Sequence, residues 1–171
     1  MENYLNIGLS VALLAFVLFT LYQSIKRHRV CRDKREEFLA KYQDAKIINL
    51  TKKWNVFFVG LAVASLVMAV VSQPEQDEIL FRLLFVWVAI MSISYMLENE
   101  MRRKVYVNND GFLYDVNYYR FRSVNKFETK RTNAHMFLFD GEDIDLPVAV
   151  ASTLTEEVEN WKQRKKDKKK K

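Results

Sequence analysis

The chain has 171 residues, of which 50% are apolar and 28% are charged, and its formal net charge is +6. This length leaves room for one ordinary domain, or for a few membrane spans and a minimal soluble domain. The apolar residues lie in three blocks, and most basic residues flank those blocks or form the C-terminal end. A nucleic-acid-binding protein would instead place its basic side chains on one face of a soluble domain. The pattern therefore predicts that the partner is the lipid bilayer, with anionic headgroups next to the Lys and Arg side chains. Nucleic acid is not expected as a partner.

The first apolar block predicts a retained transmembrane helix within residues 1–25. Residues 4–25 carry no charged side chain, and about 20 residues with a rise of about 1.5 Å each match a hydrocarbon core of about 30 Å. No basic residue precedes the block, and Lys26-Arg27-His28-Arg29 follows it. A cleaved signal peptide would have the opposite pattern, with a basic start and a small-residue cleavage site.

Two further blocks predict spans at residues 54–72 and 79–98. Lys52, Lys53 and Trp54 open the second block, as expected of an interface anchor whose ammonium groups and indole lie at headgroup level. The third block contains Arg82 about one turn from its start. We interpret Arg82 as an anchor that reaches the interface, and the alternative is a functional cation buried in the membrane.

The loops predict the orientation of the spans in the plasma membrane. Residues 26–53 hold ten Lys or Arg against four acids, whereas the short link at 73–78 holds no base. Arg102-Arg103-Lys104 follows the third span. Because Lys and Arg near span ends stay cytoplasmic, we expect the N-terminus and the 73–78 hairpin outside, and the 26–53 loop and the C-terminus in the cytoplasm.

Small residues recur at helical spacing in two of the spans. Gly8-xxx-Ala12 and Gly60-xxx-Ala64 permit close helix contact. They predict either packing within the chain or contact with a homo-oligomer or another membrane protein.

The basic loop 26–53 contains an amphipathic segment and the single cysteine. Phe38, Tyr42 and Ala45 recur at helical spacing, which predicts a short helix over 33–48, lying against the membrane or against the C-terminal domain. Cys31 excludes an intramolecular disulfide. It is either a reduced thiol or, close to a span, a site of S-palmitoylation.

Residues 99–161 predict a small cytoplasmic α+β domain of about five short strands and a closing helix. Asp110-Gly111 and Asp140-Gly141 each separate alternating apolar runs, which indicates hairpins in which glycine supplies a positive φ. Thr153 and Glu156 form a capping box that predicts the helix start. We expect residues 101–171 to fold alone, around a core of Val105, Phe112, Tyr114, Phe127, Phe137, Leu146, Val158 and Trp161.

The order of these features resembles a known type of membrane protein. Asp110-Gly111-Phe112, the aromatic and basic run at 118–124, the strand at 136–139 and Leu146-Pro147 before a helix resemble bacterial PH-like domains. Together with the spans, the chain is similar to the uncharacterised three-span bacterial membrane proteins of the UPF YobD-like type. The resemblance implies no established activity. It implies at most an accessory role near mannose-type phosphotransferase transporters.

No pattern in the chain predicts a catalytic, cofactor-binding or metal site. His28 and His135 stand without a second ligand at a useful spacing, so we interpret them as surface or strand positions. The basic tail at 162–171 predicts either a solvated end or a contact with anionic lipid. The candidate lipid or partner contacts are Arg120, Arg122, Lys126, Lys165, Lys166, Lys168 and Lys169.

The expected function is that of a non-catalytic accessory or scaffold protein, which presents a PH-like domain at the inner leaflet. The alternative is a subunit or regulator of a larger transporter, such as a mannose-type phosphotransferase permease, or an immunity-type protein. Neither expectation involves a cofactor.

Overall fold

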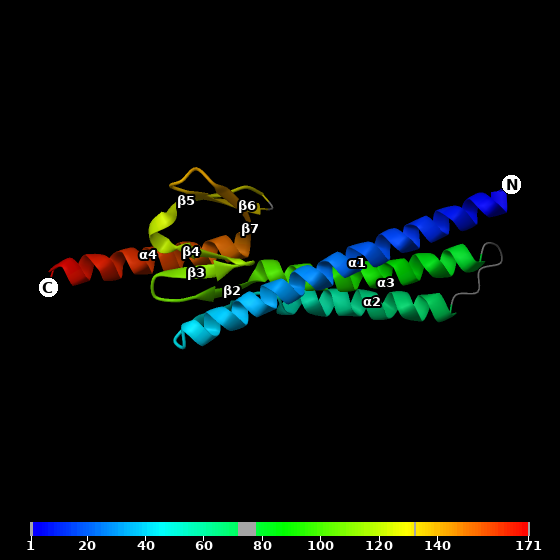
Figure 1. Cartoon of the computed structure of the whole chain (residues 1–171), viewed down its shortest axis with the longest axis horizontal. Helices are drawn as coiled ribbons and strands as arrows, with labels where there is room; N and C mark the ends of the chain where they lie inside the picture. Colours follow the sequence, from blue (N-terminus) through cyan, green and yellow to red (C-terminus); the bar gives the residue numbers. More distant parts are fainter. Residues whose placement is uncertain (1, 72–77, 132, 171) are drawn as a thin grey trace. The chain divides into compact units, whose positions relative to one another are not determined.

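The computed structural model describes residues 2–71, 78–131 and 133–170, and divides the chain into two compact units (Figure 1). The helical unit comprises Met1–Val30 and Lys52–Glu100, and the sheet unit comprises Cys31–Thr51 and Met101–Lys171. Each unit is therefore assembled from two separate stretches of the chain.

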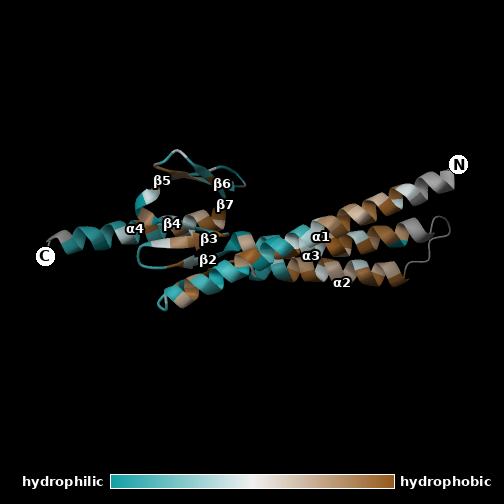
Figure 2. Cartoon of the chain, viewed as in Figure 1, coloured by the Kyte–Doolittle hydropathy of each residue, from teal (hydrophilic) through white to brown (hydrophobic). Residues whose placement is uncertain are grey.

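The helical unit contains three long apolar helices, which confirms the prediction of three segments able to cross a membrane. They are α1 (Glu2–Lys41), α2 (Lys52–Val71) and α3 (Glu78–Arg103), and each is long and apolar enough to span a bilayer. Figure 2 shows the apolar residues concentrated along them. Most of the expected 73–78 hairpin lies outside the described residues, and Glu78 begins α3.

The first helix is much longer than the predicted span. It has 40 residues, which correspond to about 60 Å at a rise of about 1.5 Å per residue. The predicted end at residue 25 marks where the apolar residues stop, and the helix itself continues to Lys41. Within the helical unit, successive inward-facing residues of α1 are separated by four and three positions in turn, a spacing typical of left-handed helix packing. These residues are Ser10, Leu14, Val17, Leu21, Ser24 and His28.

Among the described residues, the two pairs of small residues do not mediate helix packing. Gly8 and Gly60 have open space where a Cβ would lie, and Ala12 and Ala64 are exposed. The prediction of internal packing is thus wrong at these positions. The inward face of α2 carries other residues, among them Asn55, Phe58, Ala62 and Ser65.

The sheet unit consists of two antiparallel sheets, a 3-10 turn and a long C-terminal helix. The first sheet has the order β1-β2-β3-β4 and the second β5-β6-β7. The elements are β1 (Lys46–Asn49), β2 (Lys104–Val107), β3 (Gly111–Tyr114), β4 (Asn117–Arg120), η1 (Phe121–Ser123), β5 (Val124–Thr129), β6 (Asn133–Leu138), β7 (Asp143–Pro147) and α4 (Val148–Lys170).

Strand β1 comes from the segment that was expected to be helical. It pairs with β2, with Asn49 opposite Lys104, so the whole α2–α3 hairpin is inserted between two neighbouring strands. Ile48 is buried in the core, whereas Ile47 on the opposite face is 49% exposed. This alternation is the period of a strand and not of a helix. The domain therefore includes residues 31–51, and the expectation that it starts at residue 99 is wrong.

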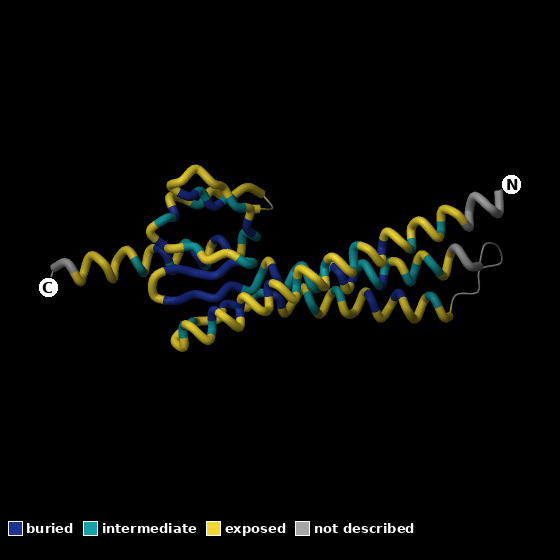
Figure 3. The backbone as a smooth tube through the Cα atoms, viewed as in Figure 1, coloured by how far each residue is buried: buried dark blue, intermediate teal, exposed yellow. Residues whose placement is uncertain are grey.

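The core of the sheet unit is formed by the two sheets and α4 (Figure 3). Of the predicted core residues, Val105, Phe112, Tyr114, Leu146 and Val158 are buried, and Phe127 and Trp161 pack against them half-buried. Phe137 was assigned to the wrong face of its strand, because its neighbours Met136 and Leu138 point inward instead. The other buried residues of this core are Ile48, Val107, Phe121, Val124, Ala134, Val150, Ala151 and Leu154.

Both predicted hairpins are present, but glycine has a different role in each. Gly141 has a φ of 91°, as expected for the turn between β6 and β7. Gly111 lies instead where a Cβ would be 2.2 Å from the carbonyl oxygen of Tyr119. Glycine is needed at position 111 because β4 approaches the backbone closely, and not because of a positive φ.

Helix α4 begins five residues before the predicted capping box and runs through the basic tail. It starts at Val148, directly after Pro147, whose fixed φ suits the start of a helix. Thr153 therefore lies inside the helix and donates a hydrogen bond from Oγ1 to the carbonyl oxygen of Ala149, at 3.0 Å. The tail that was expected to be a solvated end is a helical arm as far as Lys170.

Candidate functional site

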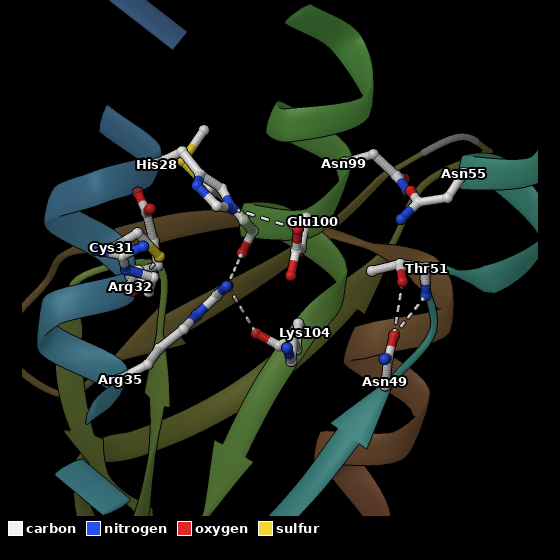
Figure 4. Close-up of polar contacts among 12 residues, drawn as sticks. His28, Cys31, Arg32, Arg35, Asn49, Thr51, Asn55, Asn99, Glu100 and Lys104 are labelled. Atoms are coloured by element: carbon white, nitrogen blue, oxygen red, sulfur yellow. Dashed lines mark hydrogen bonds and ion pairs between the residues drawn. The ribbon is translucent and has the colours of Figure 1, made fainter. Parts of the chain in front are cut away.

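A buried arginine connects α1 to the start of the first sheet within the sheet unit. The side chain of Arg35 is only 4% exposed. Its Nη2 donates to the carbonyl oxygens of Met101, at 3.1 Å, and Lys104, at 3.3 Å (Figure 4). Its guanidinium also lies 5.5 Å from the ring centroid of Tyr106. Carbonyls at a helix C-terminus lack partners within the helix and carry partial negative charge. Arg35 therefore donates to carbonyl oxygens at the end of α3 and at the start of β2, where the helical hydrogen bonds stop.

The cysteine lies one turn before Arg35 and is fully buried. Its Sγ donates to the carbonyl oxygen of Asp115, at 3.1 Å. A buried thiol with a hydrogen-bond acceptor agrees with the interpretation of Cys31 as a reduced, structural residue. Acylation would require the thiol to leave this position.

Both histidines have a carboxylate partner. In the helical unit, His28 Nε2 lies 3.3 Å from Glu100 Oε2, and Asn99 donates to Asn55 at 2.8 Å (Figure 4). In the sheet unit, His135 Nδ1 lies 2.6 Å from Asp145 Oδ1, its cross-strand neighbour. His135 lies in β6, as the strand interpretation expected, whereas His28 is a half-buried polar link between α1 and α3 and not a surface position.

The basic residues predicted on the strands are all exposed. Arg120 ends β4, Arg122 lies in η1 and Lys126 lies in β5. Lys126 pairs with Glu128, and this hydrogen bond lowers the pKa of the Glu128 carboxyl. The ammonium group of Lys126 also lies 5.0 Å from the ring centroid of Phe137. Its charge therefore already has partners on the outer face of the second sheet.

The basic residues predicted in the tail lie on the helical arm of α4. Lys165, Lys166 and Lys168 are exposed, and the side chain of Lys169 lies outside the described residues. Lys165 Nζ is 4.7 Å from the ring centroid of Trp161. Lys126 lines a groove of about 310 Å³ between β5 and α4, and the tail residue in that groove is Lys162, which was not predicted as a contact.

A groove that the sequence did not predict lies between the end of α1 and the first sheet. The rings of Tyr42 and Tyr118 stack with centroids 6.2 Å apart, and Phe38 lies 4.8 Å from Tyr42 and 5.8 Å from Tyr118. The hydroxyl of Tyr118 donates to Asn108 Oδ1 at 3.3 Å, and burial raises the pKa of Tyr118. We call this the aromatic groove; it has a volume of about 240 Å³ and is lined by Lys34, Phe38, Lys41, Tyr42, Leu113 and Tyr118, with Glu37 and Val116.

The sequence pattern identifies the α1 side of this groove but not the strands that face it. Cys31, Arg35, Phe38 and Tyr42 continue the steps of four and three that the inward face of α1 follows from Ser10 onward. This spacing identifies which residues face inward, but it does not identify β3 and β4 as their partners.

Within the part of the chain that the structure describes, no group of three or more His, Cys, Asp or Glu could hold a metal ion. No protein-family model, curated protein or solved structure matches the chain.

Proposed function

We propose that this protein is a non-catalytic accessory or scaffold protein of the bacterial plasma membrane, which presents a PH-like domain on the cytoplasmic side. The pairing of β1 with β2 is the observation that carries this proposal. Only Leu50 and Thr51 separate β1 from α2, and α3 passes directly into β2. A domain whose central sheet is completed across a membrane hairpin stays at the membrane, as a scaffold must.

The arrangement of the strands supports the PH-like assignment. Two antiparallel sheets follow one another in the chain, and α4 packs on them through Val150, Leu154 and Val158. The glycine turn, the aromatic and basic strand, the paired strands and the Leu146-Pro147 step before the helix occur in the order that the resemblance implies.

We expect the 26–53 segment to be cytoplasmic and the 73–78 hairpin to be outside, because basic residues near span ends stay inside. In a Cys31→Ser background, an impermeant maleimide added to intact cells should label a cysteine at Gln76 and leave a cysteine at Gln43 unlabelled. Gln43 is exposed, so it should react once the cells are permeabilised. Labelling of Gln43→Cys in intact cells would reverse the orientation and contradict the cytoplasmic placement of the domain.

Purification from the native membrane in a mild detergent tests the scaffold proposal against the transporter alternative. A scaffold should purify with partners that are present below stoichiometric amounts and are lost on washing. A transporter subunit should bring down a permease in a fixed ratio through every step. A stable permease complex would favour the alternative and contradict the proposal.

The helical arm supports anionic lipid headgroups as a further partner. Its described side chains Lys162, Arg164, Lys165, Lys166 and Lys168 are exposed, and no apolar residue follows Trp161. A helix of this kind attaches by charge and does not insert. Attachment should fall steeply between 0.1 M and 1 M salt, where the Debye length decreases from about 10 Å to about 3 Å. In flotation assays with acidic vesicles, binding of the sheet unit at 1 M salt, or after deletion of 162–171, would contradict this role.

A further inference from the structure

The aromatic groove has the composition of a site that binds an aromatic side chain next to negative charge. Phe38, Tyr42 and Tyr118 provide ring faces, and Lys34 and Lys41 are exposed beside them. Lys41 Nζ lies 5.5 Å from the Tyr42 centroid, and Lys34 Nζ is 2.8 Å from Glu37 Oε2. Aromatic residues in pockets carry much of the binding energy of interfaces, and a basic rim selects acidic partners.

The turn between β6 and β7 of the same chain has the complementary composition. Phe139 is 70% exposed, the highest exposure among the large apolar residues of the sheet unit. Asp140, Glu142 and Asp143 follow it and are exposed, and no base occurs between Phe139 and Leu146. We call Phe139, Asp140, Glu142 and Asp143 the acidic turn.

The acidic turn is held in one conformation. The backbone N–H of Phe139 donates to the carbonyl oxygen of Ser123 at 3.0 Å, and that of Leu138 donates to Glu142 at 2.9 Å. Asp140 Oδ1 accepts the backbone N–H of Glu142 at 3.2 Å. A pre-organised turn loses little conformational freedom when it binds, which suits it to enter a groove.

The groove and the turn cannot meet within one copy. In Figure 1 the β6–β7 turn lies on the opposite side of the sheet unit from the end of α1, and Phe139 is exposed. We propose that the acidic turn of one copy docks into the aromatic groove of a second copy, with Phe139 against the tyrosine rings and the carboxylates beside Lys34 and Lys41. This contact joins two different surfaces, so it is heterologous and can continue from copy to copy.

The helical arm is the competing basic surface for the acidic turn. Its charge is greater than that of the groove, but its described residues from Lys162 to Lys168 are exposed on every side. It can attract the carboxylates, but the groove that Lys162 lines beside β5 contains one aromatic ring, Phe127, and not the three rings of the aromatic groove. The two surfaces are separable by experiment.

The test uses the full chain in native membranes, with a photoreactive benzophenone amino acid in place of Phe139. Irradiation should give cross-linked dimers and higher species, and mass spectrometry should place the cross-links in residues 34–42 or 113–118. The same probe in place of Phe137, half-buried on the neighbouring strand, should cross-link at least about tenfold less. Cross-links that map to 162–170, or the absence of dimers, would overturn the proposal.

Charge reversal at exposed residues gives an independent test. D140K also removes the acceptor of the Glu142 N–H, so the groove variant K34E/K41E, which leaves the turn unchanged, is the decisive one. K34E/K41E, or D140K/E142K, should each reduce cross-linking by about tenfold or more, since like charges then face each other. The chain carrying all four changes should recover cross-linking. A mixture of the two double variants offers the native contact and its charge-reversed counterpart, so cross-linking should return between the two variants and not within either one. Unchanged cross-linking in K34E/K41E would refute the contact.

Discussion

A protein in which residues 31–51 are joined to residues 101–171 by a short Gly-Ser linker should be soluble and folded without α2 and α3. The linker replaces the α2–α3 hairpin, which follows β1 and precedes β2. The ends of these two strands are adjacent, because Asn49 lies opposite Lys104 and the Leu50 N–H donates to the Arg103 carbonyl at 3.0 Å. The sheet unit retains its whole core and the Arg35 contacts. Circular dichroism should show one cooperative thermal transition, and NMR should show dispersed amide signals.

The matched control is the fragment 101–171, which the sequence alone suggested as the domain. It lacks Phe38 and Ile48, both buried, together with the whole of β1. Loss of one large buried apolar side chain costs about 2–5 kcal/mol, and small domains have a total stability of about 5–15 kcal/mol. The fragment should therefore have no cooperative transition. Equal stability of the two proteins would show that β1 and the end of α1 contribute nothing to the fold.

The three helices that could cross a membrane were predictable from the sequence, because a helix that crosses a bilayer must be apolar for about 20 residues. The same criterion gave the wrong end for α1. Charge begins at Lys26, but the helix has no reason to stop there, since neither Gly nor Pro occurs between residues 26 and 51. Hydropathy located the end of the apolar stretch, whereas the helix ends only after Lys41.

The strand β1 could not be recognised from local sequence. It has four residues, and its partner β2 follows only after two long helices. A short strand owes its conformation to the partner strand and to burial more than to intrinsic preference. Alternation predicted the hairpins β2–β3 and β6–β7 because each pair is close in sequence. Alternation could not show which face of β6 points inward, because the adjacent residues Met136 and Phe137 are both apolar.

The contacts of the candidate site could not be predicted from local sequence either. In the sequence, Arg35 is one of ten Lys or Arg residues in the 26–53 segment, and charged residues of this kind are usually exposed. Only the structure shows that Met101 and Lys104 present two carbonyl oxygens to it. The exposed bases of the arm were easier to predict, because a run of lysines can hardly be buried.

Arg35→Ala should be among the most destabilising single changes in the sheet unit. It removes this donor from the buried carbonyl of Met101 and from the partly buried carbonyl of Lys104, and a buried acceptor left unsatisfied costs about 1–3 kcal/mol. The stacking of the guanidinium on Tyr106 is lost as well. For a unit of this size we expect the thermal midpoint of the linked 31–51/101–171 protein to fall by more than about 10 °C.

Arg32→Ala is the matched control, because Arg32 lies on the same turn of α1 with a side chain that is 62% exposed. It is 3.7 Å from Asp33 and 3.6 Å from Glu36, and exposed pairs of this kind contribute about 0–1 kcal/mol. Arg35→Lys should fall between the two, since a single ammonium group has no planar fork with which to reach both carbonyls. If Arg35→Ala and Arg32→Ala have the same midpoint, the buried arginine does not hold α1 to the sheet. The end of α1 would then depend on Phe38 and Tyr42, which pack against Tyr106 and Leu113.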